Sequence, residues 1–238
     1  MRAIRLSIDG RWGHFRKAET NNNPLSHDFI TKTALIGLIG AVNGIEREAM
    51  KILFPKLCNS LLYGVEIKAE VKKQSWGFTF RQASDVLQQA PRYMEILSHP
   101  SYSVTIACLD SADGECQEIF DFFSHSIENN ISKFTPVLGI HNCPADILFE
   151  SKGIITEEGT GNFSTLGFIS KKHTLNIRSG VNLRLGFDRI PTYQNDDFWN
   201  LPEHYETIIY PNIGGRLDAI GTFFLYQTAS ISDELYLI

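Results

Sequence analysis

The chain has 238 residues, of which 43% are hydrophobic and 11% aromatic, so it can bury a core as one large or two small domains. Its formal net charge of −5 argues against a simple basic nucleic-acid binder. The four cysteines are widely spaced and form no CxxC pair, so we expect reduced, buried thiols in a cytoplasmic protein rather than a disulfide or a zinc site. We expect neither a signal peptide nor a membrane span, because no apolar run is long enough.

The charge is divided unevenly along the chain. Residues 1–100 contain 14 Lys and Arg against 9 Asp and Glu, whereas residues 101–238 contain 8 against 18. This division predicts a positive half that faces a polyanion and an acidic half that faces solvent or a basic partner. The alternative is that charges of both signs are interleaved over the surface after folding.

Hydrophobic periodicity assigns strands where apolar residues alternate and helices where they recur every three or four residues. The assignments up to residue 149 are a strand at 2–9, a helix at 31–42 that stops at Asn43-Gly44, a short helix at 46–57, a strand at 61–72, an unassigned excursion at 73–100, a strand at 102–109, a helix at 116–127, and strands at 134–138 and 145–149. This is the β-α-β-β-α-β order of an α+β, ferredoxin-like (RRM-like) fold. The remainder is predicted to be a β-rich C-terminal subdomain with apolar runs at 165–169, 174–177, 183–187, 207–210 and 222–226.

The loop after the first strand concentrates groups that bind nucleic acid. Arg11, Arg16 and Lys17 suit phosphate, and Trp12, His14 and Phe15 suit stacking on unpaired bases. The alternative is that Trp12 and Phe15 anchor the loop to the core. This loop is the leading candidate for a functional site.

Two further places support contact with RNA. Lys32, near the start of the first predicted helix, is placed to reach an anion at the helix N-terminus. The excursion interleaves basic and aromatic residues, which fits RNA contact, although a hairpin docked on a partner protein has the same composition. Within the excursion, we expect RNA contact from Trp76, Arg81, Arg92 and Tyr93.

Catalysis has little support in the sequence. No known catalytic motif or paired metal-ligand set is found, so we predict no cofactor, no metal and no catalytic residues. Lys171, Lys172 and His173 are residue types used in metal-independent RNA cleavage, but a solvated basic turn is the simpler interpretation.

Three segments and the order of elements resemble the CRISPR-associated protein five family of the RAMP superfamily. The segments are Gly13-His14-Phe15-Arg16-Lys17, then Thr31-Lys32-Thr33-Ala34-Leu35-Ile36-Gly37-Leu38-Ile39-Gly40-Ala41, and last Phe134-Thr135-Pro136-Val137-Leu138-Gly139 followed by Cys143-Pro144-Ala145. The resemblance covers about residues 1–150. The glycine-rich loop found near the C-terminus of many RAMP proteins has only a loose counterpart at 212–216.

The resemblance implies a ferredoxin-like RNA-binding domain over residues 1–150, with a thumb hairpin inserted at about 73–100, and a β-rich subdomain over residues 151–238. It implies a non-catalytic subunit of a type I CRISPR Cascade complex, which binds the 5′ handle of the crRNA and caps one end of the complex for antiviral DNA recognition. The implied handle-binding residues are His14, Phe15, Arg16 and Lys32, and the implied thumb residues are Trp76, Arg81, Arg92 and Tyr93.

The implied partners are the crRNA 5′ handle, the Cascade backbone subunit, the large PAM-sensing subunit and target DNA near the PAM. Two alternatives stay open. In one subtype of the family the subunit is itself a metal-independent endoribonuclease for precursor crRNA, and Tyr63, Lys171, Lys172 and His173 have suitable types but no supporting spacing. The other alternative is an RRM-like module that binds protein only.

Overall fold

The computed structural model describes residues 1–20, 22–82, 85–156, 159–176, 183–195 and 201–238, and for 80–82 and 85–89 it describes the backbone only. Within these ranges it has three helices, α1 (Lys32–Asn43), α2 (Arg47–Ser60) and α3 (Gly114–Glu128). The strands are β1 (Arg2–Asp9), β2 (Trp12–Gly13), β3 (Leu61–Ile67), β4 (Lys73–Gln82), β5 (Asp85–Ser98), β6 (Ser101–Cys108), β7 (Asp146–Ile155), β8 (Gly159–Thr165), β9 (Ile169–Ser170), β10 (Thr174–Asn176), β11 (Leu185–Tyr193), β12 (His204–Pro211), β13 (Leu217–Gln227) and β14 (Ser232–Leu235).

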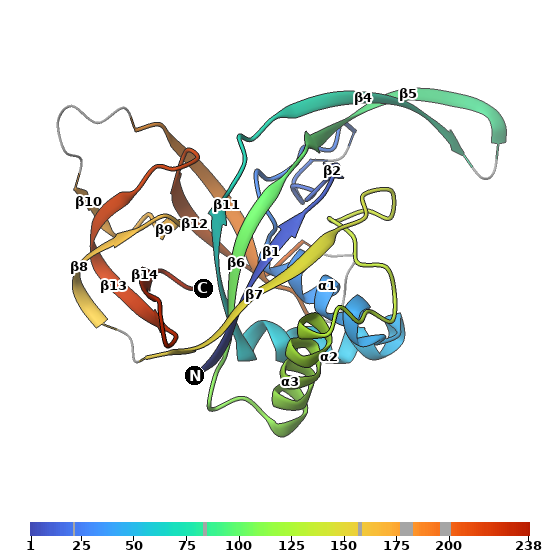
Figure 1. Cartoon of the computed structure of the whole chain (residues 1–238). Helices are drawn as coiled ribbons and strands as arrows, with labels where there is room; N and C mark the ends of the chain where they lie inside the picture. Colours follow the sequence, from blue (N-terminus) through green and yellow to red (C-terminus); the bar gives the residue numbers. More distant parts are fainter. Residues whose placement is uncertain (21, 83–84, 157–158, 177–182, 196–200) are drawn as a thin grey trace.

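The first 155 residues form a ferredoxin-like unit whose strands lie in the order β7-β1-β6-β3, each antiparallel to its neighbour. The three helices cover one face of this sheet (Figure 1). The alternation of β1 explains the layering, because Ile4, Leu6 and Ile8 are buried in the main core, whereas Arg5 and Ser7 point to the opposite face. The predicted α+β, ferredoxin-like order is therefore confirmed.

The first helix has the ends that its sequence predicts. The Thr31 side chain accepts a hydrogen bond from the Ala34 N–H at 3.3 Å and caps the N-terminus. At the other end, Gly44 adopts the left-handed conformation with φ 74°, and its N–H donates to the carbonyl groups of Ala41 and Gly40. These caps hold the apolar face of α1 against the sheet.

The unassigned excursion is a long hairpin, which we call the thumb and which consists of β4 and β5. The two strands pair from Lys73↔Leu97 up to Gln82↔Asp85, with a register shift after Arg81. The hairpin projects beyond the sheet as a curved arm (Figure 1). At its base, β2 adds a short third strand by pairing Trp12 with Ser98.

The C-terminal part is β-rich, as predicted. β13 extends the main sheet from the end of β7 and also pairs with β8, β10 and β14, while β11, β12 and β9 form a separate three-stranded sheet. This second sheet is joined to the ferredoxin-like unit by buried residues such as Ile190 and Ile208, which belong to the main core.

One predicted strand is wrong. Residues 134–138 form a compact loop, in which the Leu138 N–H bonds to the Cys143 carbonyl at 2.7 Å instead of to a neighbouring strand. The apolar pattern predicts a strand there, although the backbone groups are satisfied locally. The apolar run at 165–169 covers the end of β8, a turn in which the Gly167 N–H bonds to the Thr165 hydroxyl, and the start of β9.

The charges of the two halves interleave in the folded protein. Cations from the first hundred residues pair with carboxylates of the remainder, in the ion pairs Arg2–Asp121, Arg5–Asp233, Lys17–Asp188 and Lys56–Glu115. The two halves are thus not separate charged surfaces, which favours the interleaved alternative. All four cysteines are free and buried, as expected. In the described part of the chain, no helix is long and apolar enough to cross a membrane.

Candidate nucleic-acid interface

The first loop and the thumb meet in an aromatic cluster at the thumb base. The rings of Trp12 and Trp76 contact edge to face, with centroids 4.8 Å apart and planes at 70°. The His99 ring lies 5.9 Å from Trp12, and the guanidinium carbon of Arg11 lies 5.7 Å from the centre of the Trp12 ring. We call Arg11, Trp12, Trp76 and His99 the thumb-base cluster. It combines aromatic faces with an exposed cation, which is the composition of a base-stacking site.

The backbone explains why these side chains meet. β2 places Trp12 on the edge of β5, and the adjacent strand β4 brings Trp76 to the same end of the hairpin. His99 has a positive φ of 52°, and its N–H bonds to the Arg11 carbonyl at 2.9 Å. The tight turn at His99-Pro100 therefore folds the histidine back toward the first loop. The sequence does not single out His99, since only its position before a proline indicates a turn.

Farther along the thumb, one face carries apolar and cationic side chains. Trp76 and Phe78 alternate along β4, and their partners Met94 and Arg92 lie opposite them on β5, so all four project from one face. Phe78 is 40% exposed although it is a large hydrophobic residue. Tyr93 projects from the other face and is 58% exposed. The thumb thus offers aromatic rings on both faces.

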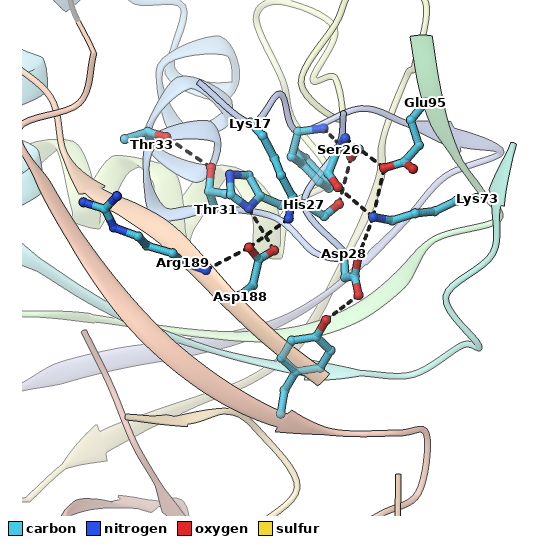
Figure 2. Close-up of polar contacts among 12 residues, drawn as sticks. Lys17, Ser26, His27, Asp28, Thr31, Thr33, Lys73, Glu95, Asp188 and Arg189 are labelled. Carbon is cyan, nitrogen blue, oxygen red and sulfur yellow. Dashed lines mark hydrogen bonds and ion pairs between the residues drawn. The ribbon is translucent and has the colours of Figure 1, made fainter. Parts of the chain in front are cut away.

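A charged network fixes the root of the thumb to the rest of the molecule (Figure 2). We call it the root network, and it consists of Ser26, Asp28, Lys73 and Glu95. The Lys73 ammonium group lies 2.7 Å from Asp28 and 2.9 Å from Glu95, and it donates to the Ser26 carbonyl at 2.7 Å. Burial opposes the charge of Lys73, but the bonds to Asp28 and Glu95 outweigh it and raise the pKa.

The same segment is tied to the C-terminal subdomain. The Tyr210 hydroxyl of β12 donates to the Asp28 carboxylate. Next to it, His27 Nδ1 lies 2.9 Å from Asp188 of β11, and the Lys17 ammonium group lies 3.0 Å from the same carboxylate (Figure 2). Burial would raise the pKa of Asp188, but the hydrogen bonds and charges of His27 and Lys17 lower it to about 2. Asp188 is therefore ionised and holds the first loop against β11.

Several predicted site residues are buried and do not form a surface. Phe15 is 2% exposed and packs against Tyr102, with ring centroids 6.3 Å apart, so it anchors the loop as the alternative proposed. His14 is equally buried, and its Nδ1 lies 2.7 Å from the Glu95 carbonyl. Burial lowers the pKa of His14, so the ring is neutral and structural. Base stacking by His14 or Phe15 is therefore ruled out in this conformation.

Lys32 also differs from the expectation. It is only 6% exposed, and burial lowers its pKa to about 8. An ammonium group enclosed in this way does not reach a phosphate at the surface. Arg16 is exposed, and its guanidinium donates to the Thr20 carbonyl at 3.0 Å within the first loop. The side chain of Arg81 lies outside the described residues.

Two of the segments that carry the family resemblance contact each other. The His14 N–H bonds to the Leu138 carbonyl at 2.9 Å. Gly139 has a φ of 88°, and a Cβ built on it would lie 1.9 Å from the His14 carbonyl oxygen. Only glycine permits this approach. The segment of residues 134–145 therefore packs directly against the first loop.

The candidate residues for RNA cleavage do not form one site. Tyr63 is fully buried, its hydroxyl has no hydrogen-bond partner among the described residues, and its ring contacts Phe168. His173 packs instead against Tyr236, with ring centroids 4.7 Å apart, and burial lowers its pKa. Lys171 and Lys172 are exposed. The described residues also contain no group of three or more His, Cys, Asp or Glu side chains arranged to hold a metal.

Comparison with known proteins identifies the fold. No protein-family model matches the chain, and no curated protein matches its sequence. A CRISPR protein from Archaeoglobus fulgidus has a similar structure, with a TM-score of 0.57 and 14% sequence identity over 99% of both chains. The chain has the fold of a CRISPR-associated protein.

A second solved structure supports this conclusion. A chain of the type III-B Cmr-beta complex, which is bound to cognate target RNA and AMPPnP, aligns with a TM-score of 0.52 and 10% identity over 90% of this chain and 86% of that chain. The similarity extends over the C-terminal subdomain as well as the ferredoxin-like unit. Identities this low establish the shared fold, and the chemistry of the site depends on the residues of this chain.

Proposed function

We propose that this protein is a non-catalytic, RNA-binding subunit of a type I CRISPR Cascade complex, which holds the 5′ handle of the crRNA at the base of its thumb. The observation that carries the proposal is the thumb-base cluster, in which Arg11, Trp12, Trp76 and His99 meet beneath a projecting hairpin. Exposed Phe78 and Tyr93 extend the aromatic surface along that hairpin.

The chemistry of this surface fits a single strand that turns at the thumb. Unpaired bases stack on aromatic rings, and Arg11 and Arg92 neutralise the adjoining phosphates. The root network anchors the hairpin, so the strand meets a fixed obstacle around which it bends. Arg16 takes a secondary role at the exposed rim of the first loop. His14, Phe15 and Lys32 support the site from within and do not touch RNA.

The proposal includes the protein partners of such a complex. A subunit that caps one end contacts a backbone subunit and the large PAM-sensing subunit, with target DNA near the PAM passing close to it. Exposed hydrophobic side chains away from the thumb, including Ile52 of α2 and Phe122 of α3, are the places where we expect those protein contacts.

The test is the guide occupancy of the assembled complex. We make Trp76→Ala and Arg92→Ala in the full chain and co-express each with the partner subunits and a guide. We expect Trp76→Ala to lower the crRNA recovered per complex about tenfold, because one stacking contact contributes about 1–3 kcal/mol. We expect Arg92→Ala to lower it as well, because a phosphate contact is lost. The matched control for the cation is Arg47→Ala, which removes an exposed charge at the N-terminal end of α2.

The outcomes separate the possible functions. Loss of crRNA in the thumb variants alone supports handle binding. Normal occupancy in both thumb variants contradicts it. Normal occupancy together with loss of a partner subunit identifies the thumb as a protein-docking hairpin instead.

A further inference from the structure

We propose that the outer face of β9, β11 and β12 is a second binding surface for single-stranded nucleic acid, separate from the thumb. The surface consists of Lys171, Lys172, Arg189 and Tyr205, with Phe187 at its border, and we call it the outer basic patch. It contains a hollow of about 420 Å³ that is lined by Lys171, Lys172, Tyr205, Glu206 and Thr207. None of these residues belongs to the thumb.

The sheet brings these residues together. The guanidinium carbon of Arg189 lies 4.2 Å from the centre of the Tyr205 ring, so the cation covers one face of the aromatic side chain. In the register of β11 and β12, Pro191 is opposite Tyr205 and Arg189 is opposite Thr207, which makes Arg189 and Tyr205 diagonal neighbours.

The lysines reach the same place through the turn after β9. The Lys171 N–H bonds to the Thr207 carbonyl at 2.9 Å, which fixes the turn beside β12. Phe187 lies two residues before Arg189 on the same face and is 64% exposed. An exposed aromatic ring beside a stacked arginine extends the platform along β11.

The positive charge of this patch is not used inside the protein. Residues 101–238 contain only eight Lys and Arg, and three of them, Lys171, Lys172 and Arg189, gather here. All three are exposed, and none of their side-chain nitrogens takes part in an ion pair or hydrogen bond among the described residues. Other strand cations are paired, as Arg5 is with Asp233 and Lys152 is with Glu128.

The nearby carboxylates do not cancel this charge. Glu206 lines the hollow, but its carboxylate accepts a hydrogen bond from the Ser170 hydroxyl within the sheet. Burial, followed by the charge of Glu19, raises the pKa of Tyr205. The phenol therefore stays protonated and able to donate a hydrogen bond. Among the described residues of the patch and its hollow, three cations outnumber the one lining carboxylate, Glu206.

The combination of groups selects the ligand. Phosphates bind lysine and arginine side chains, and an unpaired base stacks on an aromatic ring or on a guanidinium plane. An acidic peptide would use the cations but would leave the aromatic faces of Tyr205 and Phe187 without a partner. A duplex offers no unpaired base to them. A single strand uses both kinds of group, so it is the ligand that we assign.

The patch lies beside the first loop. The Lys17–Asp188 ion pair holds that loop against β11, at the residue next to Arg189. The same loop begins at Arg11 in the thumb-base cluster, so one segment of the chain joins the two surfaces.

The test measures the binding of two labelled oligonucleotides to the full chain. The probes are oligouridylate RNA and oligothymidylate DNA of about 12 nucleotides, within the range that single-strand sites cover. We expect the triple variant Lys171→Ala/Lys172→Ala/Arg189→Ala to bind at least tenfold more weakly. We also expect the slope of log affinity against log salt to fall by about 2, since each lost phosphate contact removes about 0.7.

The aromatic part of the patch has its own readout. Tyr205→Ala should weaken binding about tenfold and leave the salt slope unchanged, because a stacking contact releases no counterion. Tyr205→Phe keeps the ring and should restore the affinity. The two probes decide the source of the strand, since stronger binding of the RNA indicates the guide and stronger binding of the DNA indicates a target strand.

The control and the contrary outcomes are defined by the same assay. Arg47→Ala/Lys51→Ala removes two cations from α2, and thermal melting of each variant checks its folding. The inference is overturned if the triple variant binds as tightly as this control, or if polyglutamate competes as well as the RNA does. If Trp76→Ala loses binding and the triple variant does not, the result contradicts this inference and still supports the proposed function. The reverse pattern supports the patch and contradicts the thumb.

Discussion

Trp12 and Trp76 meet edge to face at 4.8 Å, although one belongs to the first loop and the other to the thumb. The contact joins two features that lie far apart in the sequence, and it makes them parts of one site. It also means that the direction of the thumb depends on the first loop. The loop is in turn held by the packing of Leu138 and Gly139 against His14 and by the ion pair between Lys17 and Asp188.

Trp12→Ala should loosen the thumb base. We expect the free energy of unfolding to fall by about 2 kcal/mol, because Trp12 is half-buried and loses both packing area and an edge-to-face contact. Chemical denaturation measures this loss. Binding of the handle RNA should fall with it, whereas Trp12→Phe, which keeps an aromatic ring, should recover most of both. Unchanged stability in Trp12→Ala would show that the two rings do not support each other.

Lys73→Met should weaken the root network. The Lys73 side chain is 27% exposed and balances Asp28 and Glu95, so its removal leaves two carboxylates without their cation. Breaking a fully buried pair costs about 3–5 kcal/mol and breaking an exposed one less than about 1 kcal/mol, so we expect a loss of about 2 kcal/mol. The matched control is Lys72→Met, because Lys72 pairs with Glu70 at the surface. Equal melting temperatures of the two variants would contradict the assignment.

The ferredoxin-like unit could be predicted because its signals are local. The alternation of residues 2–9, the Thr31 and Gly44 caps and the periodicity of the third helix each act within a few residues. The thumb could be predicted only from the resemblance, since the pairing of β4 with β5 is a relation between two segments. The strand predicted at 134–138 is wrong because its apolar residues pack under the first loop, which no local pattern reveals.

The candidate site could be predicted in part, and for a related reason. Aromatic and basic residues do gather in the first loop and in the thumb, but the sequence does not distinguish a ring that faces solvent from one that faces the core. Phe15 and Tyr93 illustrate this point, since the first is buried and the second is exposed. The outer basic patch could not be predicted because Lys171 and Lys172 are distant in sequence from Arg189 and Tyr205, and only the register of β11, β12 and β9 joins them.

Asp188 should make stability depend on pH in the acid range. Its pKa is about 2 in the folded protein against an ordinary value of 3.8, so the ionised form stabilises the fold. A depressed carboxyl pKa contributes stability above the unfolded value, and this contribution is lost as the pH falls from about 4 to about 2. The shift corresponds to about 2 kcal/mol. Denaturation of Asp188→Asn over this range should show a stability that falls less steeply than that of the wild type. Parallel curves would contradict the role given to His27 and Lys17.

The purified chain should not cleave repeat RNA in the presence of EDTA. Tyr63 is enclosed by the core, and His173 is packed against Tyr236, so neither reaches an RNA backbone together with Lys171. The measurement is a time course with end-labelled RNA, with and without the chelator. Specific cleavage that disappears in His173→Ala would overturn the binding-only function. Cleavage that persists in this variant would point to a contaminating nuclease.

Lys32→Met should stabilise the protein at neutral pH. Lys32 is 6% exposed and its pKa is about 8 in the folded protein, against 10.5 ordinarily, so the folded state disfavours the charged form. Below pH 8 the charge must be buried, at a cost of about 3 kcal/mol, and methionine of similar length avoids this cost. The stability of the wild type should rise between pH 8 and 10.5, as the unfolded chain keeps a proton that the folded chain has lost, and the advantage of the variant should shrink over the same range. Chemical denaturation at pH 7 and above pH 10 measures both effects. Binding of the handle RNA should be unchanged, and a loss of binding in a stabilised variant would return Lys32 to the RNA-binding surface.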